Sequence, residues 1–458
     1  MKNNNNQIIY DILQSSKSYG SIDEILKWIK HKNESLKVNI ERHSINNQKQ
    51  WFIDDNGVIR NQNNSFFSIL GIHYHNEGKT IEHPIIIQDE IGYLGIICKH
   101  IDGILHFLMQ AKIEPGNLNK IQISPTIQAT KSNFTQKHGG KRPLYYEYFA
   151  NAKEHQIIVD QLQSEQSSRF LGKRNRNIII YVEKEVEVYE NHMWMTMYQI
   201  KQLMKHDNLV NMDTRTVLSC IPYYSYDENY LNVKDMFSDQ SMYQSMFQGN
   251  DVNLIPQIYH SINNYKMFNK QNYELVPITS LRNWTITDYE IRSNEEFDFK
   301  IIFCDISIEK REVVHWFQPL LAANGKALFG LYTSVIDGIR KFLVHIKPEI
   351  GSFDSIEIGP TVQLESSAIN SSNNSIDQTF IIQWNAQKNV LHDVLLSEEG
   401  GRFYHEENFN VILDIDANSL EIDDDKYFWV SYQTLNQLIQ VNNCVNIQLR
   451  NLLSLLEI

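Results

Sequence analysis

The chain has few cysteines, and they are far apart. Four occur in 458 residues, at Cys98, Cys220, Cys304 and Cys444. None belongs to a Cys-x-x-Cys pair or has a histidine at the short spacing that a zinc site requires. We therefore expect buried, reduced thiols in the cytoplasm, and neither a disulfide framework nor a metal centre.

Long apolar runs and an excess of basic residues are absent as well. No run reaches the roughly 20 residues of a membrane-spanning helix, and the polar start, Met1 to Asn6, is unlike a secretory signal. The 42 Lys and Arg residues face 55 Asp and Glu residues, which gives a net charge of −13. We expect no nucleic-acid or membrane partner, although a local basic cluster can bind a small anion.

What the chain does contain is one pattern that occurs twice. Residues 107–128 and 342–363 share a Lys-x-Glu strand, a glycine and a Pro-Thr-x-Gln run, at a constant offset of 235 residues. Farther upstream, Trp51 recurs as Trp284 after a small slip in the offset. Self-similarity of this kind indicates tandem copies of one module.

The two copies define the predicted domain organisation. A capping box at Ser21 and the helical spacing of the apolar residues after it predict a helix. Strand-like runs begin at Trp51. We expect an α+β fold built from a helical N-terminal segment (1–50), a first module (51–220), an aromatic helical linker (221–280) and a second module (281–458).

In both copies, polar side chains fall on one face of the repeated strands. A strand that begins at Phe107 puts Lys112 and Glu114 opposite its apolar residues, and Thr126 and Gln128 alternate in the same way on the next strand. One interpretation is a solvated face with an ion pair worth at most about 1 kcal/mol. The other is the floor of a pocket for a polar ligand.

Only the first copy continues with a segment that is dense in polar, basic and aromatic groups. Its candidate residues are Thr130, Lys131, Ser132, Asn133, His138, Tyr145, Tyr146 and Glu147. The second copy continues at 364–374 with a polar stretch that has no histidine and no tyrosine cluster. Because a purely structural role should be needed in both copies, this difference favours a functional role for residues 129–149.

A cluster of cations precedes a predicted strand in the first copy. Three of them fall within four positions, with Arg169 before and Asn177 after them: Lys173, Arg174 and Arg176. Guanidinium groups pair bidentately with phosphate oxygens, so the cluster could bind a diphosphate. An ordinary charged loop is the alternative. The second copy has Tyr404 to Asn408 at this place, without a cation, which favours the functional interpretation.

Several segments resemble the NDP-hexose 2,3-dehydratase family. They are Gln110 to Lys112, Glu114 to Asn117, Ser124 to Thr130, His138 to Gly140, Leu162 to Gln166, Lys173 to Asn177, Asp207 to Asp213, Gly359 to Gln363 and Leu396 to Phe403. The segments follow the family's order along nearly the whole chain.

The resemblance implies an enzyme. The expected substrate is a nucleotide-activated 4-keto-6-deoxyhexose, usually dTDP-4-keto-6-deoxy-glucose, which loses water across C2 and C3 to give a 3,4-diketo-2,6-dideoxy sugar. The resemblance also implies two Nudix-like modules per subunit and a homodimer. The elimination itself requires no redox cofactor, and we expect no metal. A reductase that acts on the C3 ketone is expected to follow in the pathway.

The implied reaction needs a base at C3, a donor to the C4 oxygen and an acid for the C2 hydroxyl. Candidate bases are Glu147, Glu114 and His138, and candidate donors are Tyr146, Tyr145 and Lys112. We rank Glu147 with Tyr146 above Lys112 with Glu114. Substrate-binding candidates are Thr126, Gln128, Thr130, Lys131, Ser132, Asn133, Arg169, Arg174, Arg176 and Asn177.

Two other functions fit parts of the sequence. A non-catalytic nucleotide-sugar binding protein is a fair interpretation of the second copy. A metal-dependent Nudix hydrolase is disfavoured, because neither copy has the Glu-rich helical box of those enzymes. At the corresponding place, Arg311-Glu312 is followed by Val313-Val314-His315-Trp316, without paired carboxylates.

Overall fold

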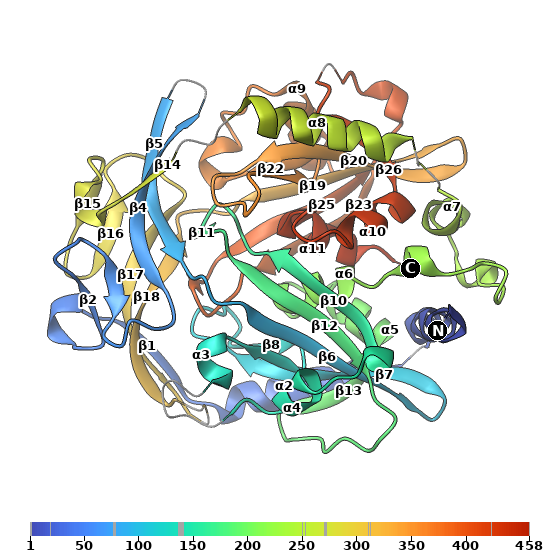
Figure 1. The fold of residues 1–458 in the computed structure, drawn as a ribbon, viewed down its shortest axis with the longest axis horizontal. Helices are drawn as coiled ribbons and strands as arrows, with labels where there is room; N and C mark the ends of the chain where they lie inside the picture. The colour runs from blue at the N-terminus through green and yellow to red at the C-terminus, as the bar shows by residue number, and fades with distance from the viewer. Residues whose placement is uncertain are drawn as a thin grey trace.

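The chain folds into mixed helices and sheets that form two similar halves. The computed structural model describes residues 2–18, 20–76, 79–135, 142–249, 251, 253–269, 273–309, 311, 313–422 and 424–457. Figure 1 shows the larger sheet of the first repeat in teal and green, beside that of the second repeat in orange and red. The predicted α+β class and the internal duplication are confirmed.

Each repeat contributes one seven-stranded sheet. The first-repeat sheet consists of β6 (Gly92–Ile101), β7 (Ile104–Ile113), β8 (Ile121–Ser124), β9 (Ile127–Ala129), β10 (Ile157–Ser164), β12 (Arg174–Tyr181) and β13 (His192–Thr196). The second-repeat sheet consists of β19 (Leu328–Ile336), β20 (Ile339–Pro348), β21 (Ile356–Gly359), β22 (Val362–Leu364), β23 (Val390–Ser397), β25 (Glu407–Asp414) and β26 (Tyr427–Ser431). The order β10-β12-β6-β7-β13 matches β23-β25-β19-β20-β26, so the repeated sequence folds as a repeated sheet.

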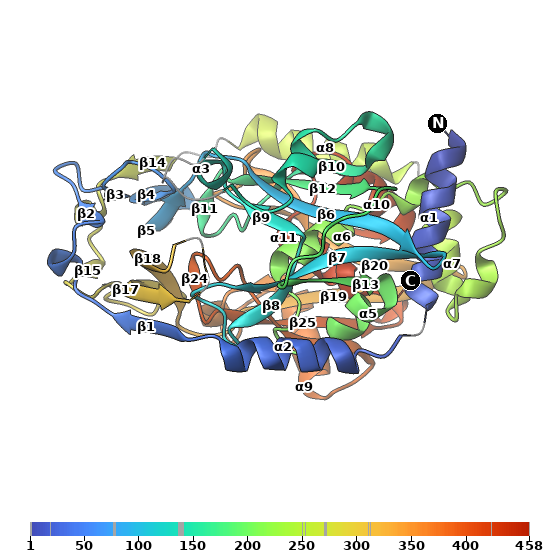
Figure 2. The ribbon, with the colours of Figure 1, turned by 90° about the horizontal axis from the view of Figure 1, so that it is seen from below.

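Two six-stranded sheets lie at the other end of the molecule, on the left of Figures 1 and 2. One consists of β2 (Trp51–Ile53), β3 (Ile59–Asn61), β4 (Ser68–Asn76), β5 (Lys79–Ile87), β11 (Phe170–Leu171) and β14 (Tyr273–Val276). The other consists of β1 (Val38–Arg42), β15 (Trp284–Ile286), β16 (Glu290–Ser293), β17 (Phe299–Ile308), β18 (His315–Ala323) and β24 (Phe403–Tyr404).

These two sheets exchange strands between the repeats. Strand β1 precedes the first repeat in the sequence but pairs with β17 of the second repeat. Strand β14 precedes the second repeat but pairs with β4 of the first repeat. Each repeat therefore begins with a strand that completes the sheet of the other, and the backbone hydrogen bonds of both sheets tie the repeats together.

A glycine turn from each repeat also packs on a loop of the other. The amide of Gly116 donates to the carbonyl of Gly400 at 2.7 Å, and the amide of Gly172 donates to the carbonyl of Gly351 at 2.8 Å. A Cβ atom on Gly116 would lie 1.5 Å from the carbonyl oxygen of Phe403. The turn therefore requires glycine because another repeat's backbone lies against it.

Replacement of Gly116 by alanine should be strongly destabilising. The clashing atom is a backbone oxygen, which can move only if the two repeats separate locally, so we expect a loss of about 3 kcal/mol in the free energy of unfolding. Gly103→Ala is the control, because its Cβ would meet nothing within 4 Å and only its φ of +81° is strained, which costs about 1 kcal/mol. Denaturant titration measures both, and equal losses would contradict this contact.

The helices cover the sheets and join the repeats. They are α1 (Lys2–Lys17), α2 (Asp23–Ser35), α3 (Lys131–Phe134), α4 (Tyr146–Ala150), α5 (Met197–Leu203), α6 (Met212–Ser219), α7 (Gln240–Phe247), α8 (Leu254–Phe268), α9 (Ser375–Asn385), α10 (Tyr432–Ile439) and α11 (Ile447–Leu455). The hydroxyl of Thr196 accepts from the first turn of α5 and that of Ser431 from α10. The helix predicted after Ser21 is present as α2, but Ile22 is its N-cap residue and forms no side-chain cap.

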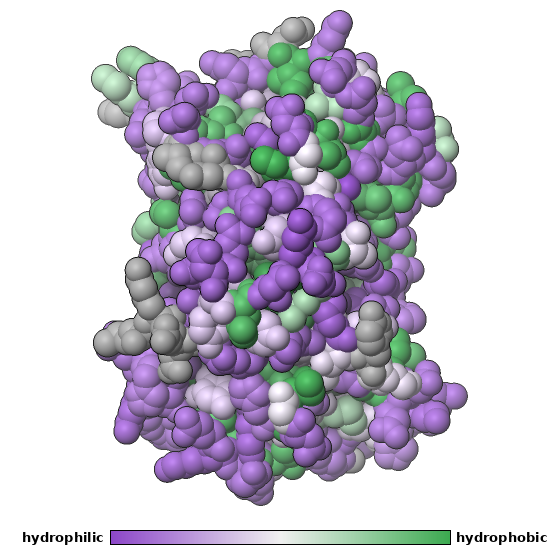
Figure 3. All heavy atoms as spheres, turned by 90° about the vertical axis from the view of Figure 1, so that its right-hand side faces the viewer, coloured by the Kyte–Doolittle hydropathy of each residue, from purple (hydrophilic) through white to green (hydrophobic). Residues whose placement is uncertain are grey.

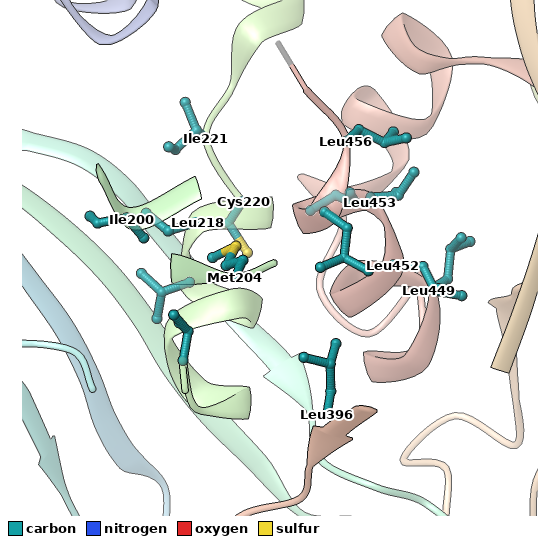
Figure 4. Packing of buried hydrophobic residues seen from close by; sticks show 14 of the residues in the cluster. Ile200, Met204, Leu218, Cys220, Ile221, Leu396, Leu449, Leu452, Leu453 and Leu456 are labelled. Atoms are coloured by element: carbon teal, nitrogen blue, oxygen red, sulfur yellow. The ribbon is translucent and has the colours of Figure 1, made fainter. Parts of the chain in front are cut away.

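Helices α6 and α11 lie at the centre, where the two repeats meet. Figure 4 shows apolar side chains around α6, such as Leu218, near those of α11, such as Leu452, with Leu396 of β23 beside them. Two buried arginines cross between the repeats in the same way. Arg215 donates to the carbonyl of Ser397 at 2.6 Å, and Arg450 donates to the carbonyl of Ser164 at 2.5 Å. Each arginine thus donates a hydrogen bond to a buried backbone carbonyl at the end of a strand in the other repeat.

The surface differs from this interior. The face in Figure 3 is mostly hydrophilic, with small hydrophobic groups scattered over it. Among the helices of the described residues, none is both long and apolar enough to span a membrane.

Candidate active site

Two cavities occupy matching places in the two repeats. The first-repeat pocket has a volume of about 520 Å³, and its lining includes Lys112, Glu114, Gln128, Glu165, Lys173, Asp213, Trp316, Gln318, Glu399 and Arg402. The second-repeat pocket has a volume of about 1550 Å³, and its lining includes His83, Arg169, Lys347, Glu349, Gln363 and Glu365. Each pocket is therefore built from both repeats. The volume of the first is typical of small-molecule sites.

The floor of the first-repeat pocket is a hydrogen-bonded network on β7 and β9. Lys112 donates to the carbonyl of Gln128 at 3.0 Å, and the Gln128 amide donates to Glu114 Oε1 at 3.0 Å. The Asn211 amide donates to Gln128 Oε1 at 3.1 Å. The predicted convergence of Lys112, Glu114 and Gln128 on one polar surface is present in the structure.

The second-repeat pocket has the same floor. Its bonds run from Lys347 to the carbonyl of Gln363 (2.7 Å), from Gln363 to Glu349 (2.9 Å) and from Asn446 to Gln363 (2.8 Å). A network that occurs in both repeats serves the architecture that they share. The residues that differ between the pockets are therefore better evidence for chemistry.

Three charged groups occur in the first-repeat pocket without an equivalent in the second. Strand register and the repeat offset align Lys173 with Glu406 and Asp213 with Gln448. Glu399 enters from the second repeat, and the aligned position in the first repeat is a glutamine. The first-repeat pocket therefore has an additional ammonium and two additional carboxyl groups.

Glu165 lies at the end of β10 and is buried. Its Oε2 accepts a hydrogen bond of 2.7 Å from the side-chain amide of Asn175, and its Oε1 has no hydrogen-bond partner among the described residues. Burial raises the pKa of this carboxyl group, while the charges of Lys173 and Arg402 oppose the rise. One oxygen is thus held in place, and the other is buried without a partner in the described part of the chain.

Asp213 lies in the first turn of α6, and Asn211 caps that helix. The aspartate is buried, and within the described part of the chain its Oδ1 has no hydrogen-bond partner. Burial raises the pKa of Asp213 well above its usual value, and the negative charges of Glu165 and Glu399 raise it further. The raised pKa favours the protonated form of Asp213, which can donate a proton.

Glu399 projects from the loop between β23 and β24 of the second repeat. Its Oε1 accepts from the amide of Gly401 and from the guanidinium of Arg402, both at 3.0 Å. Burial raises the pKa of Glu399 to about 7, although Arg402 favours the ionised form. This carboxyl group exchanges its proton close to neutral pH.

Lys173 begins the run that leads into β12. It is buried, and its ammonium donates to the carbonyl of Glu90 at 2.5 Å. Burial lowers the pKa of Lys173 to about 8, and the nearby positive charge of Arg402 contributes to the shift. The pocket therefore combines a cation with carboxyl groups whose pKa values are raised, and such perturbed groups are typical of sites of general acid–base catalysis.

Arg402 reaches the pocket from the second repeat and rests on Phe66 of the first. Its guanidinium lies 4.8 Å from the Phe66 ring centroid and donates to Gln88 Oε1 at 2.9 Å. Phe66 itself has a φ of +79°, a left-handed conformation that is strained for a bulky residue. This backbone conformation places the Phe66 ring against the guanidinium of Arg402 at the pocket wall.

Seven of the predicted site residues line the first-repeat pocket: Lys112, Glu114, Thr126, Gln128, Thr130, Ser132 and Asn133. The first-ranked pair does not. Glu147 is exposed and forms an ion pair with Arg142, and Tyr146 stacks on Phe134 at a centroid distance of 5.1 Å. Tyr145 is buried in a local core, where its hydroxyl donates to the carbonyl of Glu187. Their catalytic roles stay predictions, and the pocket geometry favours other groups.

The predicted cations are also occupied elsewhere, and these assignments likewise stay predictions. Arg174 lies 3.7 Å from the ring centroid of Phe353, and Arg176 is held by both oxygens of Asp160. Asn177 is buried and donates to the carbonyl of Asn175. Lys131 is exposed, and His138 lies outside the described residues.

Arg169 lines the second-repeat pocket, where a carboxylate neutralises it. Its guanidinium donates to both oxygens of Glu365, at 3.2 and 2.8 Å. In the first repeat, the position aligned with Glu365 is Thr130, which carries no charge. The equivalent arginines of the two pockets thus take their carboxylate partners from different places, Arg169 from Glu365 and Arg402 from Glu399.

Within the described residues, no group of three or more His, Cys, Asp and Glu side chains is arranged to hold a metal ion. The side chains around the first-repeat pocket form ion pairs and hydrogen bonds with one another instead.

Most of the chain matches a known protein family. A family model described as NDP-hexose 2,3-dehydratase matches residues 22–221 and 256–456, one segment in each repeat. The chain belongs to the NDP-hexose 2,3-dehydratase family. The resemblance seen in the sequence is therefore confirmed, and the gap between the matched segments falls in the linker that contains α7.

Relatives of known function support this membership in the NDP-hexose 2,3-dehydratase family. A dTDP-4-dehydro-6-deoxy-alpha-D-glucopyranose 2,3-dehydratase of Streptomyces violaceoruber is 34% identical over 434 residues, which cover 93% of this chain and 95% of the relative. Proteins of the same name from Saccharopolyspora spinosa (36% over 398 residues; 86% and 82% covered) and Amycolatopsis orientalis (31% over 452 residues; 94% and 89% covered) are also similar.

The sequence interpretation assigned no role to Glu165, Asp213 or Glu399 of this dehydratase. All three belong to segments that carried the family resemblance, so the resemblance was the signal that could have identified them. Glu399 and Arg402 were harder to assign, because they lie in the second repeat while the pocket floor lies in the first. The loop that carries Glu399 and Arg402 reaches the pocket because it packs on the turn at Gly116 of the first repeat.

Proposed function

We propose that this chain removes water across C2 and C3 of dTDP-4-keto-6-deoxy-glucose, and that the first-repeat pocket performs the reaction. The observation that carries the proposal is the buried cluster of Glu165, Asp213, Glu399 and Lys173, three members of which the second-repeat pocket lacks. The names of the three relatives supply the substrate. The product is the 3,4-diketo-2,6-dideoxy sugar.

In the first step, we assign Glu165 as the base that removes the proton from C3. The ketone at C4 makes this proton acidic, because the electron pair left on C3 is shared with the C4 oxygen as an enolate. Asn175 orients Glu165 through one oxygen, the other oxygen has no hydrogen-bond partner among the described residues, and the residue lines the pocket. A raised pKa makes the carboxylate a stronger base than an exposed one.

The enolate needs positive charge near the C4 oxygen, and two ammonium groups line the pocket. Lys112 bonds to the floor in the same way as Lys347 in the other repeat, whereas Lys173 has a glutamate as its counterpart. We therefore assign the larger share of enolate stabilisation to Lys173. Its burial strengthens the effect, because a preorganised cation acts more strongly in a site from which water is excluded.

In the second step, the enolate expels the hydroxyl group from C2, and Asp213 donates the proton that turns it into water. The C2–C3 double bond then carries the enol of the 3,4-diketone. Transfer of a proton to C2 and loss of the proton from the enol oxygen complete the tautomerisation. Glu165 has then lost the proton that it took, and Asp213 has regained the one that it gave. One water molecule is lost overall, with no net oxidation or reduction.

Turnover in the presence of a trap tests this proposal. The purified chain should convert dTDP-4-keto-6-deoxy-glucose, together with a 3-ketoreductase and NADPH, into a stable dTDP-2,6-dideoxy sugar that mass spectrometry detects. EDTA should leave the rate unchanged. Binding of the substrate without product would favour the alternative of a non-catalytic nucleotide-sugar binding protein. Release of dTMP that EDTA abolishes would favour a Nudix hydrolase.

Further features of the proposal come partly from the sequence and partly from the family resemblance. We propose that each repeat is a Nudix-like module, with the divisions at residues 50, 220 and 280 that the sequence predicts. We also propose that the enzyme is a homodimer in the cytoplasm. A reductase of the C3 ketone is the expected next enzyme, because a 3,4-diketone is reactive and needs prompt reduction.

A further inference from the structure

A buried amide in the second repeat connects two parts of the first-repeat pocket. Gln318 lies on β18 and is 4% exposed. Its Nε2 donates to the carbonyl of Gly401 at 2.7 Å, and its Oε1 accepts from the indole nitrogen of Trp316 at 2.8 Å. Both polar ends of this side chain are therefore committed, which fixes its orientation.

The partner on one side belongs to the turn that carries Glu399 and Arg402. The amide of Gly401 donates to Glu399 Oε1, and Arg402 donates to the same oxygen. A Cβ atom on Gly401 would lie 2.3 Å from that oxygen, so the carboxyl group lies directly against this peptide. Anchoring the carbonyl of Gly401 thus fixes the residue whose amide holds Glu399.

The equivalent position in the first repeat makes no such connection. Register places His83 of β5 where the second repeat has Gln318. The His83 ring bonds to the carbonyl of Pro84, the next residue of the chain, and its centroid lies 5.7 Å from that of Phe297. The anchor therefore occurs only on the side that delivers a carboxyl group to the first-repeat pocket.

We propose that Gln318 is a positioning residue for the dehydration: it fixes the Glu399–Arg402 turn and the Trp316 side chain against the substrate. The inference rests on the proposed function. It also gives the second repeat a role, since that repeat supplies one wall of the site even though its own pocket lacks the acid–base cluster. A displaced turn would change the distance between Glu399 and Arg402, and with it the ionisation of the pocket near neutral pH.

Two substitutions separate the two hydrogen bonds of Gln318. Gln318→Met has a similar length and loses both bonds, whereas Gln318→Glu can still accept from Trp316 but cannot donate to Gly401. We expect kcat to fall by about 10- to 100-fold in both variants, as misplacement of a catalytic group by a fraction of an ångström to 1 Å would cause. KM should change less than threefold, and the acid limb of the kcat profile should shift by about half a pH unit or more.

His83→Met is the matched control, because it removes a buried polar side chain at the equivalent position beside the other pocket. Its kcat and pH profile should equal those of the wild type. Wild-type enzyme that gives no dideoxy product in the reductase-coupled assay would overturn the proposed function. Active wild type with unchanged kcat and pH profile in both Gln318 variants would overturn this inference alone. A lowered melting temperature with an unshifted pH profile would also overturn it, because that outcome indicates a purely structural role.

Discussion

Replacement of Glu165 by glutamine should lower kcat by about 10³-fold, within the range of roughly 10² to 10⁴ that a general base contributes. The amide has the same shape and can keep the contact with Asn175, but it cannot accept the proton from C3. KM should change little, because glutamine preserves the hydrogen-bonding surface toward a bound sugar. Steady-state kinetics in the reductase-coupled assay measure both parameters.

The duplication provides a matched control for this variant. Glu398 is the counterpart of Glu165: each is buried, and each accepts a 2.7 Å hydrogen bond from an asparagine on the neighbouring strand. Glu398 is absent from the lining of the first-repeat pocket. Glu398→Gln should therefore retain wild-type kcat. Equal losses in the two variants would mean that both glutamates serve the fold, and Glu165 would not be the base.

Replacement of Lys173 by methionine should lower kcat by about 10²- to 10³-fold, the effect of removing one preorganised charge from an oxyanion site. The substitution also removes the nearest positive charge from Glu165, so its pKa should rise further and less of the base should be ionised. Lys347→Met is the control, because it removes a lysine from the floor of the second-repeat pocket, which lies outside the proposed active site. Activity that survives in Lys173→Met would contradict the role of this cation.

The pH dependence gives a second test of Lys173. Its pKa is lowered to about 8 by burial, so the ammonium is present below this pH and is lost as the pH rises through it. Turnover should decline along the same limb. In Lys173→Arg the guanidinium stays charged, and the alkaline limb should move upward by at least one pH unit. A limb that stays at the same pH in this variant would exclude Lys173 as its origin.

The repeated strands could be predicted from the sequence because their chemistry is local. The alternation of Lys112 and Glu114 with apolar residues fixes which face they share, and the Pro-Thr-x-Gln run brings Gln128 beside them. The duplication of this pattern then predicted the repeated sheet. These inferences needed no knowledge of how the repeats contact each other.

The ranking of Glu147 and Tyr146 used the difference between the copies, and the structure offers a packing reason for part of that difference. Phe149 of α4 lies over Gly95, where a Cβ would be 2.5 Å from its ring. Phe380 of α9 lies over Gly330 at 2.4 Å in the same way. Two unlike segments thus fill the same role, so loss of similarity after the repeated strands does not by itself indicate function.

The remaining site residues could not be placed because they depend on contacts between the repeats. Glu399 and Arg402 are far from Lys112 in the sequence, and they reach the pocket only because the turn at Gly116 packs on their loop. The sequence contained both partners but no local pattern that pairs them. The buried position of Asp213 depends likewise on the packing of α6 between the sheets.

Turnover in D₂O tests the central claim most directly. The claim is that the C3 proton leaves first and that C2 later takes a proton from a group that exchanges with water. The dTDP-2,6-dideoxy product trapped by the reductase and NADPH should contain one deuterium atom at C2, located by NMR and counted by mass spectrometry. A product that forms at the normal rate with no deuterium at C2 would contradict the account.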